Sequence, residues 1–384
     1  MIVDCLYSQN NDILMRIDEN VKKIMVMEPN PFHGEVIPGV VEYLIKLGYS
    51  VDLFVRKELI MDGIASILPS QTKVYEFTLS DLQNLFQNKK ICDYDFLFLT
   101  SLEIQIGNEI HSFIRYFNFE VMTKYGVLGI YHTSTFVSQF HDEKMYSDGR
   151  IFLLSDFQVE NGEGQVLNPH FFNKNACINI KKNRSGKVKI VVLGNICDYR
   201  MVGKALSKLT LAERKRIQVI HTGIKNDIKT IIKRLAKKVI VYVCALVDSR
   251  FREKKCAMHI IEMGRLNFPD LLKLVDSADY LLMPIDMNTT EGKHYVSVST
   301  SGTKQMSLGM NVPIIANDVV GGIYGFDRSN SVFYEKDNLE EAFRSVIDDN
   351  GQSDRIKNLK KAEEKIYIQS LENLRLAIEK NSYL

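Results

Sequence analysis

The residues best suited to chemistry lie in the stretch 298–315, which reads VSTSGTKQMSLGMNVPII. A short helical pattern begins inside it, and the positions at its start are Ser301, Gly302, Thr303 and Lys304. The first turn of a helix carries backbone N–H groups without intrahelical partners and the positive end of the helix dipole, and both bind phosphate. We therefore expect a diphosphate-binding site here, with an ordinary N-cap that binds nothing as the alternative.

Lys304 adds a positive charge to this expected site. A leaving nucleoside diphosphate gains negative charge in the transition state, and a fixed cation stabilises that charge without a metal ion. The alternative is a solvated lysine, although the helix dipole opposes a cation in the first turn.

Two residues with acid–base chemistry lie in the loop at residues 28–39, which reads EPNPFHGEVIPG. His33 and Glu35 flank Gly34 there, and either could deprotonate a hydroxyl within hydrogen-bond reach. Both could instead fix the loop, since the charge of Glu35 alone would stabilise the start of the next helix.

No spacing of His, Cys, Asp or Glu residues is typical of a metal site. The triplet Asp93-Tyr94-Asp95 matches an Asp-x-Asp metal motif, but it enters an expected strand instead of ending one. The six cysteines lie far apart without CxxC spacing, which indicates neither zinc nor a disulfide framework. We therefore expect no metal and no cofactor.

Short apolar runs alternate with helical patterns through the first half of the chain. The expected strands are residues 23–29, 51–55, 74–77, 94–99 and 127–131, and the expected helices are residues 37–47, 79–87 and 110–125. This alternation predicts βαβ units and a parallel sheet. His132 follows the last of these strands, at the carboxyl edge where ligands of such sheets bind, although a lone histidine at a strand end is more often structural.

A polar stretch at residues 181–186 interrupts the pattern and is a candidate linker. Beyond it the expected strands are residues 188–193, 218–222, 239–245, 258–262, 280–284 and 312–315, with helices at 226–236, 269–275 and 304–310. This predicts an α/β chain with a second doubly wound sheet and a cleft between the two. We divide the chain into a domain at 1–183, a domain at 184–352 and a helical segment at 353–384.

The composition indicates an ordinary soluble globular protein, since 25% of the residues are charged and 45% are hydrophobic. A formal net charge of +2 gives no reason to expect nucleic acid as a partner. The first residues, MIVDCLYSQNNDILMR, lack the pattern of a secretory leader, and no apolar run approaches the roughly 20 residues of a membrane span. We therefore expect a cytoplasmic protein, either free or attached peripherally to the plasma membrane.

Together these motifs resemble the GT-B glycosyltransferases, in particular bacterial ones that build surface polysaccharides. The resemblance is best in residues 258–286 and 301–318. In such enzymes a strand leads to a glycine, a short helix, an Ala-Asp pair, a strand ending in proline, and then the helix that holds the donor diphosphate. The residues in those places here are Gly264, 268–275, Ala278, Asp279 and Pro284.

The resemblance implies two Rossmann-like domains, with a nucleoside diphosphate sugar of the UDP or GDP type bound to the second and an acceptor bound to the first. The acceptor would be a glycan linked to a lipid carrier, since enzymes of this kind extend such glycans. It implies diphosphate contacts by Gly302, Thr303 and Lys304, phosphate contacts near Gly194, Asn195 and Arg200, and nucleotide-base contacts by Gly264 and Arg265. His132 resembles a histidine that lies near the donor sugar in several such families.

One departure from the pattern leaves the mechanism open. Retaining members usually carry two glutamates separated by seven residues, the second in the helix before a Gly-x-Pro turn, whereas residues 304–311 contain no acidic residue. Glu291 or Gln305 could take part instead. The alternatives to a glycosyltransferase are a sugar-nucleotide 2-epimerase of the same fold and a non-catalytic module that binds a sugar nucleotide or a glycan.

Overall fold

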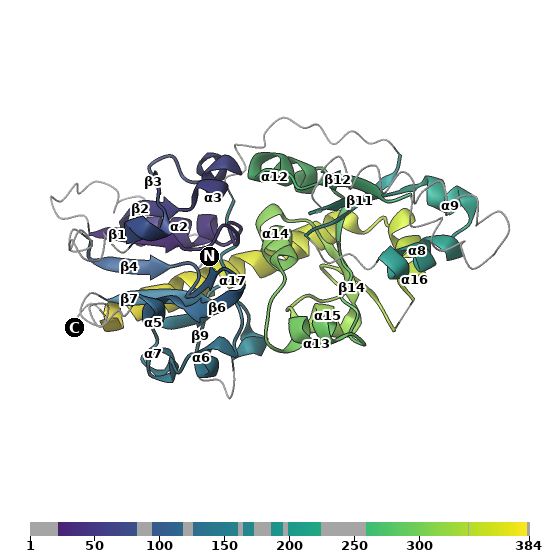
Figure 1. Ribbon diagram of the computed structural model, residues 1–384. Coiled ribbons are helices and arrows are strands. Elements are labelled where there is room, and N and C mark those ends of the chain that lie inside the picture. Colours follow the sequence, from purple (N-terminus) through teal and green to yellow (C-terminus); the bar gives the residue numbers. More distant parts are fainter. Residues whose placement is uncertain are drawn as a thin grey trace, which may run out of the picture.

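Two parallel β-sheets, one from each half of the chain, organise the computed structural model (Figure 1). The structure describes residues 22–82, 94–117, 126–159, 164–172, 186–194, 199–223, 259–336 and 338–381. The two parallel sheets confirm the predicted α/β architecture with two doubly wound sheets. The predicted boundary at 183/184 lies outside the described residues, and the one at 352/353 stays a prediction.

The first sheet has seven strands in the order β3-β2-β1-β4-β7-β8-β9, and every pairing in it is parallel. The strands are β1 (Lys23–Glu28), β2 (Ser50–Val55), β3 (Lys73–Glu76), β4 (Phe96–Leu99), β7 (Val127–Tyr131), β8 (Ile151–Leu153) and β9 (Gln165–Val166). The central strands β1, β4 and β7 are almost wholly apolar and buried, as strands covered on both faces must be.

Short helices connect these strands. They are α2 (Ile37–Lys46), α3 (Lys57–Met61), the 3-10 helix η1 (Ile64–Ile67), α5 (Phe113–Tyr116), α6 (Phe136–Gln139), α7 (Glu143–Ser147) and the 3-10 helix η4 (Asp156–Gln158). The helix expected at residues 110–125 is wrong at its start, because β6 (Glu109–Ser112) pairs antiparallel with β5 (Glu103–Ile106). Gly107 adopts the left-handed φ of 63° that this tight hairpin requires.

The second sheet has six strands in the order β12-β11-β10-β13-β14-β15, again all parallel. The strands are β10 (Val188–Val192), β11 (Ile217–Thr222), β12 (Ile261–Gly264), β13 (Tyr280–Met283), β14 (Ile314–Asn317) and β15 (Val332–Tyr334). The strand expected at 239–245 and the helix expected at 226–236 lie outside the described residues.

The helices of the second half are α8 (Tyr199–Lys208), α9 (Leu211–Lys215), α12 (Phe268–Asp276), α13 (Thr290–Ser297), α14 (Gly302–Met310), α15 (Asp318–Ile323) and α16 (Leu339–Ile347). After them α17 (Gln352–Asn381) runs as one helix of 30 residues from the second half back across the first, in yellow in Figure 1. It is tied to the first half by a bond from the Asn168 N–H to Ser370 Oγ at 3.0 Å and by the pair His170 Nε2–Glu363 Oε1 at 2.9 Å.

One buried apolar cluster joins the two halves, since it includes Val26 of β1, Leu308 of α14 and Leu374 of α17. Burial of this kind is the main stabilising contribution to a fold of this size. Among the described residues, no helix is both long enough and apolar enough to cross a membrane.

Candidate active site

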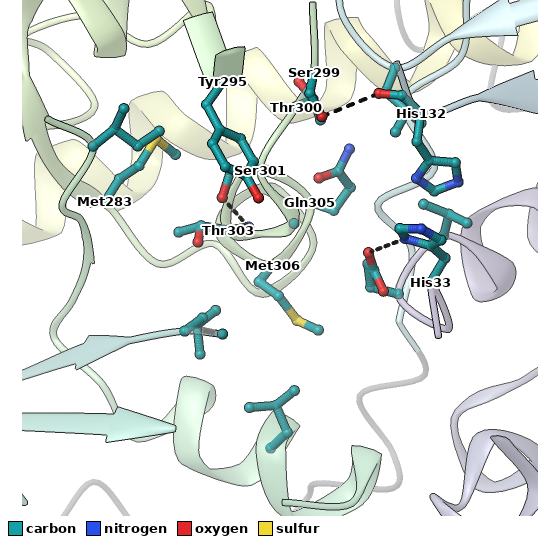
Figure 2. A pocket seen from close by; sticks show the side chains of 18 of the residues that line it. His33, His132, Met283, Tyr295, Ser299, Thr300, Ser301, Thr303, Gln305 and Met306 are labelled. Atoms are coloured by element: carbon teal, nitrogen blue, oxygen red, sulfur yellow. Dashed lines mark hydrogen bonds and ion pairs between the residues drawn. The ribbon is translucent and has the colours of Figure 1, made fainter. Parts of the chain in front are cut away.

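A cavity of about 360 Å³ lies between the two halves, and side chains of both line its wall (Figure 2). The strands β1 and β7 of the first sheet and β10 and β13 of the second end beside it. This is the carboxyl-edge position at which doubly wound sheets bind ligands. Its polar lining residues are His33, Glu35, His132, Tyr295, Ser299, Thr300, Ser301, Gly302, Thr303 and Gln305.

Hydrogen bonds beside the cavity connect the two halves. The Ser134 N–H donates to Val298 O at 2.8 Å, and Gln158 Nε2 donates to the same oxygen at 2.8 Å. The N–H of Phe268, another residue that lines the cavity, donates to Asp62 O at 2.8 Å. Direct contacts thus join the two halves at more than one place around the cavity.

The first turn of α14 forms one wall of the cavity. Ser301 is the N-cap, and its Oγ accepts from the Thr303 N–H at 3.3 Å, while its own N–H donates to Tyr324 OH at 3.1 Å. In the described part of the chain no acceptor pairs with the Gly302 N–H. This end of the helix therefore presents a free donor and the positive end of a dipole to the cavity, which suits an anion.

Lys304 points out of this wall towards the first half of the chain. It is only 4% exposed, and its Nζ donates a hydrogen bond to Ser155 Oγ at 2.8 Å. Burial lowers the pKa of Lys304 to about 8, against the opposing charge of Asp156. The residue is not among those that line the cavity. The structure thus places this cation beside the cavity, at the contact between the halves.

His33 and Glu35 lie on the opposite wall, on the loop that follows β1. His33 adopts a φ of 64°, and its Nδ1 lies 3.6 Å from Glu35 Oε1. Burial alone would lower the pKa of His33, but the nearby Glu35 carboxylate, with the charges of Glu28 and Glu103, raises it to about 9. Burial likewise would raise the pKa of Glu35, and His33 lowers it.

The Glu35 carboxyl group also faces α14. A methyl group placed on Gly302 would lie 3.5 Å from Glu35 Oε1. A carboxylate is therefore held opposite the helix turn that could bind a phosphate.

His132 stacks on His33, with the ring centroids 3.9 Å apart and the planes tilted by 34°. Its Nε2 lies 3.1 Å from Thr100 O, and because a carbonyl only accepts, this nitrogen carries the proton. Burial and the charge of His33 lower the pKa of His132 to about 3. His132 is therefore a neutral imidazole of fixed orientation at neutral pH.

Two buried carboxyl groups that the sequence did not single out lie near His33, although neither lines the cavity. Glu28, at the end of β1, accepts from the Asn30 N–H at 2.8 Å, Thr100 Oγ1 at 2.8 Å and Ser101 Oγ at 2.7 Å. Burial raises the pKa of both Glu28 and Glu103 to about 7. An acidic residue that ends an apolar strand was the available signal for Glu28; nothing in the spacing pointed to Glu103.

Gln305, in the first turn of α14, is 1% exposed and lines the cavity. Neither Nε2 nor Oε1 of its amide has a hydrogen-bond partner within the described residues. Since a buried polar group without a partner costs free energy, this amide is suited to bind a ligand that supplies both an acceptor and a donor.

The other residues singled out in the sequence are placed as follows. Gly194 follows β10 with a φ of 76° and lines the cavity, whereas Asn195 lies outside the described residues. Arg200 is exposed on the first turn of α8, away from the lining. Gly264 ends β12, and Arg265 forms an ion pair with Asp62 of the first half; neither lines the cavity.

The arrangement puts an anion-binding helix terminus and an imidazole–carboxylate cluster on facing walls of one cavity. Such a site can hold a phosphate group on one side and receive a proton from a bound hydroxyl on the other.

No protein-family model matches the sequence, and no curated protein sequence matches it. Solved structures do match the fold. A glycosyltransferase from Rickettsia africae aligns with a TM-score of 0.59 and 12% identity over 94% of this chain and 99% of that one. The Anabaena protein HepE, solved in complex with UDP and glucose, aligns with a TM-score of 0.57 and 11% identity over 94% of this chain and 100% of that one. At such low identity these matches show the fold alone, and that fold is GT-B, the two-domain fold of glycosyltransferases.

Proposed function

We propose that the protein is a glycosyltransferase, which moves a sugar from a nucleoside diphosphate donor to an acceptor hydroxyl. The observation that carries this proposal is the first turn of α14 with its free Gly302 N–H, which faces His33 and Glu35 across a cavity between two GT-B domains. A nucleoside diphosphate sugar needs both an anion site for its leaving group and a proton acceptor for the attacking hydroxyl.

The donor diphosphate would bind to Ser301, Gly302 and Thr303, where the backbone N–H of Gly302 is free. As the bond between the sugar and the diphosphate breaks, negative charge develops on the leaving oxygen. The helix terminus is fixed before the reaction and stabilises that charge without reorganising. Lys304 contributes indirectly, because its bond to Ser155 holds α14 against the first half.

The acceptor would bind on the side of the first half, beside His33, Glu35 and His132. Its hydroxyl oxygen forms the new bond to the anomeric carbon, and its proton passes to the carboxylate of Glu35. Glu35 is the favoured acceptor of the proton because its carboxyl group faces both His33 and α14. Closure of the two domains around the substrates would exclude water and so limit hydrolysis of the donor.

Four finer assignments belong to the same proposal. UDP is the first nucleotide to test, because HepE was solved with UDP and glucose; GDP is the second. The acceptor is a growing surface glycan on a lipid carrier, and the reaction takes place in the cytoplasm or at the inner face of the plasma membrane. The domain limits are residues 1–183 and 184–352, followed by the helical segment 353–384.

Thermal unfolding with and without millimolar UDP or GDP, in the presence of EDTA, tests donor binding. We expect one nucleotide to raise the melting temperature, because a ligand that binds only the folded chain stabilises it. Gly302→Asp puts a carboxylate in the helix turn and should abolish that rise. The matched variant Gly322→Asp, at an exposed position of α15, should keep it.

Product analysis then separates the possible activities. A transferase forms a glycoside only when an acceptor is added, a 2-epimerase converts the sugar nucleotide without one, and a binding module does neither. No stabilisation by any nucleoside diphosphate would contradict the proposal at its first step.

A further inference from the structure

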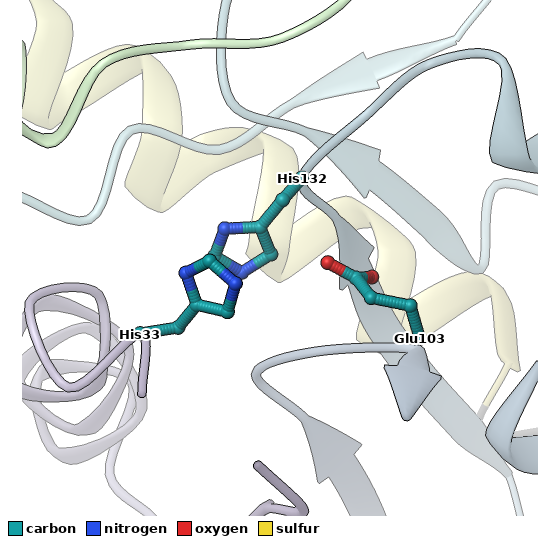
Figure 3. A group of neighbouring side chains, drawn as sticks. All are labelled: His33, Glu103 and His132. Atoms are coloured by element: carbon teal, nitrogen blue, oxygen red, sulfur yellow. The ribbon is translucent and has the colours of Figure 1, made fainter. Parts of the chain in front are cut away.

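His33, Glu103 and His132 form a compact cluster at the edge of the cavity (Figure 3). His33 comes from the loop after β1, Glu103 begins β5, and His132 follows β7. One ring nitrogen of each histidine and one carboxylate oxygen of Glu103 all lie within 4.8 Å of one another. The three side chains are brought together by the parallel sheet, since each follows a neighbouring strand.

Glu103 brings to this cluster a buried carboxyl group with one oxygen that accepts no hydrogen bond among the described residues. The residue is 5% exposed, and its Oε2 has no hydrogen-bond partner among the described residues. The neighbouring Glu28 differs, because its two oxygens accept from three donors. A buried carboxylate oxygen without a partner is costly, and a cation would satisfy it.

The two imidazoles are oriented as metal-binding histidines usually are. Nε2 of His132 donates to the backbone carbonyl of Thr100, and Nδ1 of His33 faces the Glu35 carboxylate. A histidine that binds a metal normally gives its other ring nitrogen to a carbonyl or a carboxylate in this way. The nitrogens left for a ligand are Nδ1 of His132 and Nε2 of His33.

We propose that His33, Glu103 and His132 bind a divalent transition-metal ion of the zinc class. Two imidazoles and one carboxylate favour Zn²⁺, Co²⁺ or Fe²⁺ over Mg²⁺, which prefers oxygen ligands. Zinc bonds of roughly 2.0–2.2 Å would bring the ligand atoms to about 3.4 Å from one another. The cluster has to contract to reach that spacing, and the partly exposed loop that carries His33 is the element that moves.

The backbone conformation of His33 supports a role for this residue in binding a ligand. Its φ of 64° lies in the left-handed region, which is uncommon for a residue with a side chain. Such outliers concentrate at ligand-binding sites. Since His33 and His132 also line the cavity, a bound ion would have a coordination position open to it.

The site can be tested by measuring metal binding to the 384-residue protein. Bound metal is first removed with EDTA, and the EDTA is then removed by dialysis. Calorimetric titration with Zn²⁺ should give one site per chain, and Co²⁺ should give a visible absorption band typical of low coordination number. Glu103→Gln, which keeps the shape of the side chain, should weaken Zn²⁺ binding by at least about 10-fold, the effect seen even for partners of metal ligands. His33→Asn should do the same, and asparagine tolerates the left-handed backbone.

The control variant is His111→Gln. His111 pairs with Glu109 at 3.4 Å on β6 and offers an imidazole and a carboxylate without a third ligand. Its removal should leave Zn²⁺ affinity unchanged. Unchanged affinity in both Glu103→Gln and His33→Asn, or loss of binding in His111→Gln, would overturn the site. No nucleotide is present in these titrations, so their outcome is independent of the proposed transferase activity.

Discussion

Lys304 on α14 donates a hydrogen bond to Ser155 of the first half, with 2.8 Å between Nζ and Oγ. Ser155 Oγ also lies 2.7 Å from Thr300 Oγ1 in the loop before α14. The residue next to the candidate phosphate site is therefore bonded across the domain contact. Lys304 therefore affects the contact between the two halves, in addition to any effect on a bound ligand.

Replacing Lys304 with methionine should stabilise the protein at neutral pH. The pKa of Lys304 falls from 10.5 to about 8 on folding, so between these values the unfolded chain binds more protons than the folded chain. The free energy of unfolding therefore rises with pH through this window, and below pH 8 burial of the charge costs roughly 3 kcal/mol. After subtracting about 1 kcal/mol for the lost hydrogen bond, Lys304→Met should gain about 2 kcal/mol at pH 7.

Urea unfolding at several pH values between 7 and 10 measures this difference. The gain of Lys304→Met over the native protein should shrink as the pH rises above 8. Lys293→Met changes an exposed lysine on α13 and should follow the native pH dependence. If Lys304→Met is less stable than the native protein at every pH, the bond to Ser155 outweighs the cost of burying the charge.

Replacing Gln305 with methionine should stabilise the free protein and weaken donor binding. Methionine has a similar length, and it removes the two amide atoms of Gln305 that have no partner within the described residues. We expect the free energy of unfolding to rise by about 1–2 kcal/mol and the dissociation constant of the donor to rise about 10-fold, the cost of one or two hydrogen bonds.

Denaturant unfolding and calorimetric titration with the donor check the two effects separately. Gln139→Met, on the exposed surface of α6, should change neither. Tighter binding by Gln305→Met would show that the amide hinders the ligand.

Much of the fold was predictable because a buried strand is visible in the sequence as a local run of apolar residues. Apolar runs such as residues 127–131 become central strands. The hairpin at β5 and β6 was missed because the apolar residues from 110 onwards also fit a helical spacing. The pairing of these two strands depends on a turn at Gly107. The spacing of apolar residues does not show which segments pair with each other.

Gly309→Ala should destabilise the protein by displacing α14. A methyl group there would lie 2.0 Å from His170 O and 2.4 Å from a ring atom of Phe172, so the helix must move away from the first half. We expect a loss of about 1–3 kcal/mol of unfolding free energy. Because the same helix forms the anion-binding wall, nucleotide binding should weaken as well.

Thermal and denaturant unfolding of a matched pair isolates this clash. Gly322 of α15 has no atom within 4 Å of an added methyl group, so Gly322→Ala should gain up to about 1 kcal/mol from helix propensity. Equal effects in the two variants would mean that α14 accommodates the methyl group without moving.

Part of the candidate site was also visible in the sequence. His33, Glu35, His132, Gly194 and the segment 301–303 all line the cavity, since each follows a strand or begins a helix at a carboxyl edge. The direction of the Lys304 side chain could not be predicted, because helix chemistry fixes only the backbone at the N-terminus. Glu103 could not be predicted either, because its burial depends on strands far apart in the chain.

Replacing Glu35 with glutamine tests the two roles that its position allows. The carboxylate faces the first turn of α14, where it opposes the approach of a phosphate, and it lies 3.6 Å from His33 Nδ1. If it accepts the proton of the acceptor hydroxyl, Glu35→Gln should lower kcat by roughly 10²-fold or more. Donor binding should not weaken, because the substitution removes a negative charge near the diphosphate.

Steady-state kinetics and donor titration with the same preparations separate these effects. Glu58→Gln neutralises an exposed carboxylate on α3 of the same half and should match the native protein in both. Weakened donor binding by Glu35→Gln with normal kcat would instead make Glu35 a residue that shapes the donor site. In that case the proton passes to another group on the same wall, and His132, whose Nδ1 carries no proton, is the next to be replaced.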